Sequence, residues 1–312
     1  NRIAGQTLAF VAADNDITKK KIDAALGLSV NAKASASIES TVKLSAKSET
    51  STTLPVSGNN SIGAAAAFSV NEVSGGTSAH ISNVEVDVES GDVSVSADTT
   101  TSLKADLSTE ASSSGGNQFG QGTSIAVNGM VATNVARGET ESKIEDSDVI
   151  AGGDVDVKAS NTSSVDATVE NATTSGDAAI GVTVAFNSVG YESENILSNS
   201  VDALLGKAAL GEEEASGAAA FIRDTEVDAD GAVNVSATAA SSLKSSVTNT
   251  TESSASALTG ATGISVGTVV SSNKVVSAAE AYIESTEAQN SVSGDSGVSV
   301  TATDNSSIDA TV

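Results

Sequence analysis

A strand-like phrase recurs five times along this chain, and this repeat constrains the fold more than any other feature. The segment GVSVTATDNSSIDATV from Gly297 aligns without a gap on GLSVNAKASASIESTV from Gly27. Three more copies begin at Asp92, Asp154 and Ala232. Self-similarity at such a period indicates an architecture in which each unit packs on its neighbours along a stack.

Within each copy, small or apolar residues alternate with polar ones. Val155, Val157 and Ala159 alternate with Asp156 and Lys158, and the pattern continues for about 15 residues. Alternation with a period of two predicts a long strand with one buried face. If the copies stack directly, one column is buried and one charged column lies outside it. The buried column is Val95, Val157, Val235 and Val300, and the charged column is Glu39, Lys104, Asp166, Lys244 and Asp309.

A second strand motif also occurs five times. Its copies are GQTLAFVA from Gly5, GAAAAFSV from Gly63, SIAVNGMV from Ser124, GVTVAFNS from Gly181 and GISVGTVV from Gly263. This alignment places Phe10, Phe68 and Phe186 at one register position. One parity of the motif is apolar, and the other parity is small and apolar, which is unusual for a solvated face. We expect that second parity to form an outer face that is buried by other protein, either from this chain or from a neighbour, and it consists of Ala65, Ala67, Met130, Ala185 and Val269.

A third, shorter element is expected between the two motifs. Its copies are Ala79-His80-Ile81, Ser142-Lys143-Ile144, Ala220-Phe221-Ile222 and Ala281-Tyr282-Ile283, and the first unit retains only Ile22. The fourth unit carries an insertion at 199–217, in which the apolar spacing of Val201 to Ala208 predicts a short amphipathic helix. A weaker helical pattern runs from Asp16 to Leu26.

The predicted fold class is therefore all-β: a parallel β-solenoid of about five wide rungs with small helical or loop insertions. Separate globular beads are disfavoured because a unit of about 60 residues without Trp has little core, and the chain has only one Pro for linkers. We expect one continuous array over 1–312. Its approximate units are 1–60, 61–121, 122–178, 179–260 and 261–312.

The charge pattern excludes nucleic acid as an expected partner. The chain has 40 acidic against 15 basic residues, a net charge of −25, and no basic stripe. No apolar stretch approaches the roughly 20 residues of a membrane helix, so membrane insertion is not expected. The simplest reading of the acidity is a solvated surface that keeps the protein soluble.

Few residues point to chemistry. His80 is the only histidine and there is no cysteine, so no nucleophile and base pair stands out, and we expect no enzyme activity and no cofactor. The weak candidates for a metal site are Asp224, Asp228 and Asp230, whose spacing suits a calcium ion held in a turn. Equivalent turns in other units lack these acids, so a solvated turn is the simpler reading.

Two phrases, IEDSDVIAGGDVDVKASNTSSV and AAIGVTVAFN, resemble the Ala/Ser/Val-rich repeats of giant bacterial exoproteins, the filamentous-haemagglutinin-like and autotransporter-like adhesins. The resemblance implies secretion to the cell surface and a structural or adhesive role as a stem or filament scaffold in adhesion, biofilm or surface-layer formation. The expected partners are the chain itself or continuing repeats of the same polypeptide, and glycans or a cell surface. The alternatives are a calcium-binding extracellular adhesin repeat and, as a second, a polysaccharide-acting β-helix enzyme.

Overall fold

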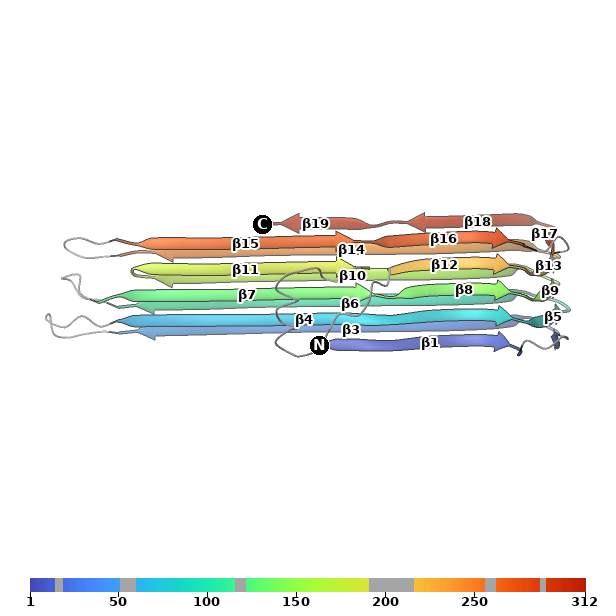
Figure 1. The fold of residues 1–312 in the computed structure, drawn as a ribbon, viewed down its shortest axis with the longest axis horizontal. Coiled ribbons are helices and arrows are strands. Elements are labelled where there is room, and N and C mark those ends of the chain that lie inside the picture. Colours follow the sequence, from blue (N-terminus) through green and yellow to red (C-terminus); the bar gives the residue numbers. More distant parts are fainter. Residues whose placement is uncertain (15–18, 51–59, 116–121, 191–215, 256–261, 287–289) are drawn as a thin grey trace.

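The computed structural model describes residues 1–14, 19–50, 60–115, 122–190, 216–255, 262–286 and 290–312. These residues form three β-sheets in which every strand pairing is parallel. Two broad sheets lie face to face along the long axis of the molecule, and a short sheet closes one end (Figure 1).

We call the six-stranded sheet the long sheet. Its order is β18-β14-β10-β6-β3, and β19 also pairs with β14. The strands are β3 (Leu28–Glu49), β6 (Val93–Ser114), β10 (Val155–Ser175), β14 (Ala232–Ser253), β18 (Gly297–Asp304) and β19 (Ser307–Thr311). This sheet contains the recurring phrase, and the alternation that predicts its strands is matched by strict alternation of buried and exposed residues in β10.

The eight-stranded sheet, which we call the divided sheet, has the order β15-β11-β7-β4-β8-β12-β16, and β1 also pairs with β4. Its strands are β1 (Arg2–Ala12), β4 (Ser61–Ser82), β7 (Ser124–Arg137), β8 (Glu139–Glu145), β11 (Ala178–Val189), β12 (Ser216–Arg223), β15 (Ile264–Val275) and β16 (Ser277–Glu284). The unbroken strand β4 pairs with β7 along its first part and with β8 along its last part. The sheet therefore has two halves joined through β4.

The short sheet has five strands in the order β17-β13-β9-β5-β2. They are β2 (Lys20–Ala24), β5 (Val84–Val88), β9 (Asp148–Ala151), β13 (Glu226–Ala229) and β17 (Val292–Gly294). Tight corners connect the divided sheet to this sheet, and Asn83, Asp146 and Asp224 occupy them with φ of 56°, 50° and 47°. Asn and Asp tolerate this left-handed conformation better than most side chains.

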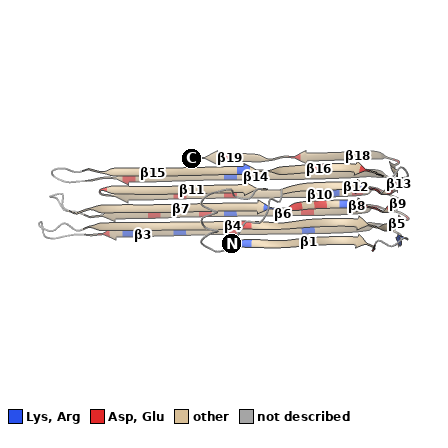
Figure 2. Ribbon diagram, viewed as in Figure 1, with Lys and Arg blue, Asp and Glu red and all other residues tan. Residues whose placement is uncertain are grey.

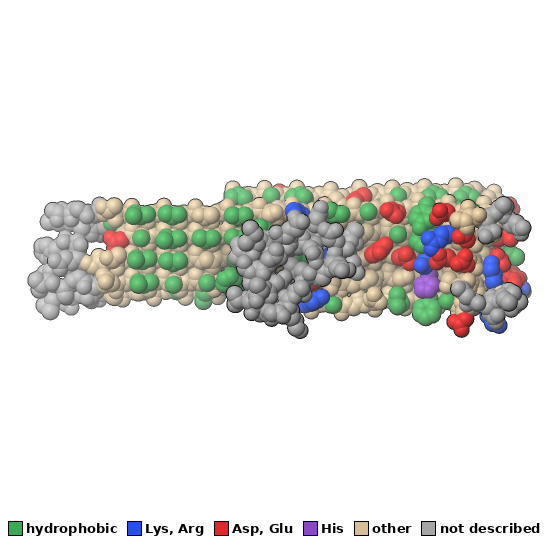
Figure 3. All heavy atoms as spheres, in the orientation of Figure 1, with side chains coloured by type: hydrophobic (Ala, Val, Ile, Leu, Met, Phe, Trp, Pro, Cys, Tyr) green, Lys and Arg blue, Asp and Glu red, His purple; other side chains and the backbone are tan. Residues whose placement is uncertain are grey.

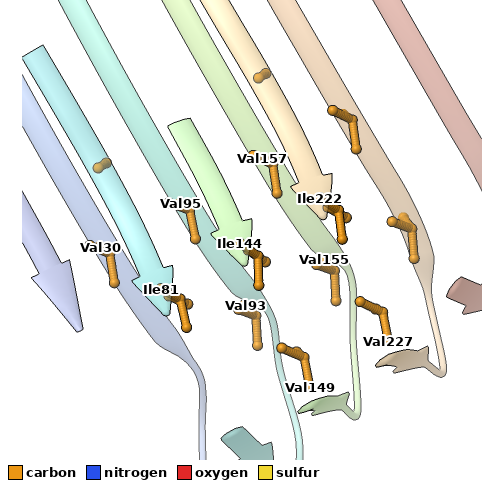
Figure 4. Packing of buried hydrophobic residues seen from close by; sticks show 14 of the residues in the cluster. Val30, Ile81, Val93, Val95, Ile144, Val149, Val155, Val157, Ile222 and Val227 are labelled. Carbon is orange, nitrogen blue, oxygen red and sulfur yellow. The ribbon is translucent and has the colours of Figure 1, made fainter. Parts of the chain in front are cut away.

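The largest core lies where the three sheets meet. Figure 4 shows Val93 and Val155 from the long sheet, Ile144 and Ile222 from the divided sheet, and Val149 from the short sheet packed together. All of these side chains are at most 1 % exposed. Val and Ile fit between closely spaced pleated sheets, so this core needs no large aromatic residue.

The predicted architecture, a parallel β-solenoid of about five wide rungs with small helical or loop insertions, is wrong. The chain is all-β, but its strands form three parallel sheets of eight, six and five strands, and the described residues contain no helix. The divided sheet departs most from a uniform rung, because β4 crosses it in one piece where later units have two strands. The weak helical pattern of Asp16 to Leu26 is also wrong, since Lys20–Ala24 forms β2. The helix expected within Val201 to Ala208 lies outside the described residues.

The third expected element is confirmed as a separate short strand in three of its four named copies and is wrong in the other copy and in the first unit. His80 lies near the end of β4 rather than on a separate short strand, and Lys143, Phe221 and Tyr282 lie on β8, β12 and β16. Ile22 pairs with Val86 in the short sheet, a separate layer that the sequence pattern did not distinguish. The first-unit equivalent of His80 is instead Phe10.

The register of the long sheet is confirmed. Val157 pairs with Val95 on one side and Val235 on the other, and Val235 pairs with Val300. The first three are buried, whereas Val300, on the last strand of the sheet, is 46 % exposed. The charged column pairs as predicted, in the order Glu39, Lys104, Asp166, Lys244 and Asp309.

The register and facing of the divided sheet differ from the prediction. Phe10 pairs with His80, Phe68 with Val131, and Phe186 with Thr133, so the three phenylalanines do not share a column. The predicted burial is confirmed for Ala65, Ala67, Met130 and Ala185, but these residues face the long sheet of the same chain and are not an outer face. Val269, on the last strand, is partly buried. The larger residues of the opposite parity point outward instead.

Candidate functional site

The outward side of the divided sheet is where chemically distinctive side chains gather, so we describe it as the candidate functional site. Charged residues lie on β8, β12 and β16, in the half of the sheet nearest the short sheet (Figure 2, Figure 3). The other half, formed by β15, β11, β7 and the first part of β4, bears rows of apolar side chains (Figure 3).

A column of aromatic and basic residues crosses the charged half. Backbone register places Phe10, His80, Lys143, Phe221 and Tyr282 side by side on successive strands. The Phe10 and His80 rings stack at 5.3 Å, and the Phe221 and Tyr282 rings stack at 4.8 Å. The Lys143 ammonium lies 5.6 Å from the centre of the Phe221 ring. Stacked rings cover one another's faces, so this column chiefly stabilises the sheet.

Ion pairs flank the aromatic column. Lys143 Nζ lies 3.2 Å from Glu141 and 3.4 Å from Glu145, and Arg223 also pairs with Glu145. Each cation therefore faces carboxylates of its own or the adjacent strand. Strands β8, β12 and β16 carry five acidic residues against Lys143 and Arg223, so this half of the face is acidic overall despite its ion pairs.

Two titratable groups of this column have shifted pKa values: partial burial raises the pKa of Tyr282, and the pKa of His80 is lowered. Partial burial lowers its pKa below the ordinary value of about 6.5, and the Lys143 charge lowers it further, while Glu141 opposes the shift. Nδ1 of His80 makes no hydrogen bond among the described residues. An acid or base role needs an oriented partner, and the described residues provide none at Nδ1, so the place of His80 in the ring stack is its clearest role.

We expect His80 to make stability pH-dependent. The unfolded chain binds the proton with a pKa of about 6.5, and the folded chain binds it less readily. Stability should therefore fall as pH drops below about 6.5. The variant His80→Phe, which keeps the ring stack, should lose less stability than the wild type between about pH 7 and 5.5 when urea midpoints are compared. Equal losses in both proteins would contradict this expectation.

A second cluster joins residues that the sequence placed apart. The carboxylate of Glu72 on β4 pairs with Arg137 of β7 and lies 3.6 Å from Arg2 Nε of β1. Glu72 is 4 % and Arg137 7 % exposed. Arg2 and Arg137 are far apart in the sequence, and the offset pairing of β1 with the later part of β4 brings them together. Within the cluster, Glu72 and Arg137 form an almost fully buried ion pair, so we assign it a structural role.

A cavity of about 350 Å³ lies beside this cluster, between β1, β3, β4 and β6. Gly, Ser and Thr residues line most of it, together with Lys33 and Arg137. Its lining contains no carboxylate, imidazole or thiol. The cavity lining therefore lacks the pair of carboxylates that glycoside hydrolysis ordinarily uses.

The predicted calcium ligands do not converge. Asp224 lies at the corner after β12, where its carboxylate accepts hydrogen bonds from the backbone N–H and hydroxyl of Thr286. Asp228 lies on β13 and accepts from the Ser293 hydroxyl, and Asp230 follows that strand. No group of three or more His, Cys, Asp or Glu residues that could hold a metal ion occurs in the described part of the chain.

We therefore expect a chelator to leave thermal stability unchanged. An ion bound only by the folded state would raise the melting temperature through mass action. Melting curves of the purified protein with and without EDTA should superimpose, and adding calcium after EDTA should shift neither. A drop of several degrees with EDTA, reversed by calcium, would instead support the Asp224, Asp228 and Asp230 site.

Within the described ranges, no helix has the length and apolar character needed to cross a membrane. Comparisons with protein-family models, with curated proteins and with solved structures give no match.

Proposed function

We propose that this chain is a structural and adhesive segment of a secreted or cell-surface giant protein, and that its broad sheet faces serve as a scaffold in adhesion, biofilm or surface-layer formation. The observation that carries this proposal is the great length of the strands compared with the small spacing that each unit adds to the stack. Strands β3, β4 and β6 are each 22 residues long, about 70 Å at about 3.3 Å per residue. Each unit of about 60 residues adds only one strand spacing, about 4.8 Å, to the stack.

Each unit therefore adds much surface to the two broad sheets but little length in the stacking direction. A stem would reach further from its anchor with short strands and many units, whereas wide strands give extended surfaces to contact a neighbour. The scaffold role is therefore better supported than the stem role. The polar, acidic outer side of the long sheet is suited to an aqueous exterior, which agrees with the proposed location at the cell surface.

The proposed partners are other copies or continuing repeats, and glycans or a cell surface. The two alternatives, a calcium-binding adhesin repeat and a polysaccharide-acting enzyme, have no support from a convergent site among the described residues. We therefore propose no catalytic residue and no cofactor.

Surface labelling tests the proposal. Antibodies raised against the purified segment should label intact cells of the producing organism, and deletion of the segment from the gene should reduce attachment or biofilm mass. Permeabilised cells provide the control for total antigen. Labelling only after permeabilisation, or turnover of a polysaccharide by the purified segment, would refute the scaffold role.

A further inference from the structure

The half of the divided sheet far from the short sheet carries an uncharged outer face. We call it the apolar panel, and it consists of the outward-facing residues of four aligned stretches: 62–71 of β4, 125–134 of β7, 178–187 of β11 and 264–273 of β15. None of these stretches contains Asp, Glu, Lys, Arg or His, in a chain that is 18 % charged. This surface is therefore much poorer in charged residues than the chain as a whole.

The panel exposes large apolar side chains to solvent. Ile62 and Phe68 on β4 are 66 % and 63 % exposed, and on the interior strands β7 and β11 Val127, Ile180 and Val182 are 39 %, 39 % and 41 % exposed. Val184 is an exception, because it is buried. Figure 3 shows these side chains as regular rows on the front of the molecule. Contiguous apolar surface of this kind marks an interaction site in soluble proteins.

We propose that the apolar panel binds a second copy of this chain, face to face, in a two-fold symmetric pair. This inference deepens the proposed scaffold role by naming one partner and its contact surface. The first argument is the contrast between the two broad sides of the molecule. Behind the panel, the outward residues of β10 are mostly polar or charged, among them Asp166, Thr168 and Glu170.

Because only one side is apolar, pairing through the panel leaves polar surface on both outer sides of the pair. Such an assembly closes at two copies, as isologous interfaces do. The absence of charge within the panel also matters for a protein with a net charge of −25, because no like charges would face each other at the centre of the contact.

The area of the panel is sufficient for a stable pair. Four strands at about 4.8 Å spacing and ten residues at about 3.3 Å give about 600 Å² per copy, or about 1,200 Å² in total. This value lies at the lower end of the range for specific protein interfaces, about 1,200 to 2,000 Å².

The relief of the panel is regular enough to fit a copy of itself. Register places Gly129 next to Ala66, which makes a low area on β4 and β7 that ends at Val182 of β11. The rows on either side are higher, with Val127 next to Ile180 in one and Phe68 next to Val131 in the other. Two such sheets can interdigitate at the usual face-to-face spacing of about 10 Å, with a high row of one copy over the low area of the other.

A charge placed in the panel tests the pairing. The variant Val127→Lys puts an ammonium at the centre of the contact and makes the net charge less negative, so any loss of association cannot come from added repulsion between whole molecules. The matched control is Thr162→Lys, an exposed position on the interior strand β10 of the opposite side. Both residues point outward, so both variants should fold, which circular dichroism checks.

In sedimentation equilibrium at about 100 µM, the wild type and Thr162→Lys should show twice the 30.6 kDa mass of one chain. Val127→Lys should show a single chain, with the dissociation constant raised at least about tenfold. A monomeric wild type, or dimerisation that Val127→Lys leaves intact, would overturn the proposal. Larger assemblies that Val127→Lys does not disperse would mean pairing through strand edges instead, and would also overturn it.

Cross-linking locates the contact independently, because the chain has no cysteine of its own. A Cβ at Gly129 meets no atom within 4 Å, so Gly129→Cys should be tolerated and should place its thiol within the contact. A short bis-maleimide should link two copies of Gly129→Cys and none of the control Thr162→Cys. Failure to cross-link at Gly129 would refute the proposed pairing, whereas the surface labelling of cells tests the scaffold role separately.

Discussion

Replacing Leu107 with Ala should lower the free energy of unfolding by about 3 to 5 kcal/mol, as for fully buried leucines that leave a cavity. Leu107 lies on β6, is 0 % exposed, and pairs with Val42 and Val169 on the adjacent strands. It is among the largest side chains of a core cluster made mainly of Ala and Val, together with Met130. Both sheets around it are fixed by continuous backbone ladders, so they cannot close over the space that the leucine leaves.

Urea denaturation followed by circular dichroism measures this effect, with Ser108→Ala as the control. Ser108 neighbours Leu107 but faces outward and is partly exposed, so its substitution should change stability by less than about 0.5 kcal/mol. A loss below about 1 kcal/mol for Leu107→Ala would show that the two sheets can approach each other locally and that this thin core is not tightly packed.

The long sheet was the part of the fold that the sequence predicted best. The register of Val95, Val157 and Val235 follows from five gapless copies of one phrase, and burial on one side makes a shift by one residue costly. The divided sheet was predicted less well, because its motif copies are shorter and align equally well after a shift of two residues. Gly63 pairs with Ala126 rather than with Ser124, the start of the motif copy.

The facing of the divided sheet could not be read from residue size. In most proteins the larger apolar residues of an alternating strand face the core. Here two long sheets lie close together, and Ala65, Ala67 and Ala185 fit between them, while Ile62 and Phe68 point to solvent. Because both sides of each strand are apolar, tertiary packing decides which side faces the core, and a single sequence does not reveal that packing. The apolar panel was missed for this reason.

The short sheet and the Glu72 cluster were missed for a different reason. Strands of three to five residues such as β5 and β17 carry too few alternations to separate them from the preceding strand. The contact of Arg2 and Arg137 with Glu72 depends on an offset of β1 that no repeat copy encodes. Asp224, one of the predicted metal ligands, occupies the same left-handed corner as Asn83 and Asp146. The structure shows this shared backbone role, which the sequence did not reveal.

A buried asparagine ladder connects the two broad sheets and was not foreseen from the sequence. Asn134 on β7 accepts a hydrogen bond from Asn71 Nδ2 at 2.9 Å and donates through its own Nδ2 to Asn187 Oδ1 at 3.0 Å. The same Nδ2 donates to the Asp166 carbonyl of the long sheet at 3.1 Å. Asn1 and Asn273 extend the ladder at its two ends. The spacing between these residues along the chain is irregular, which hides the column from a search for repeats.

Replacing Asn134 with Leu, which is similar in size but apolar, should lower the free energy of unfolding by about 2 to 5 kcal/mol. Asn71, Asn134 and Asn187 are at most 2 % exposed, so the substitution leaves an amide donor of Asn71 and the side-chain carbonyl of Asn187 without partners and without water. Each such buried group costs about 1 to 3 kcal/mol. The control is Asn234→Leu, where the amide bonds to Asp156 on the outer side of the long sheet and the loss should stay below about 1 kcal/mol.

The triple replacement of Asn71, Asn134 and Asn187 with Leu separates the two explanations for that loss. If the cost arises from unsatisfied partners, removing neighbouring members together removes the partners as well, and the triple variant should lose clearly less than three times the loss of Asn134→Leu. If leucine simply does not fit between the sheets, the losses should add or exceed the sum. Urea midpoints of the single and triple variants distinguish these outcomes. Additive losses would show that the ladder stabilises the fold through the fit of its side chains rather than through its hydrogen bonds.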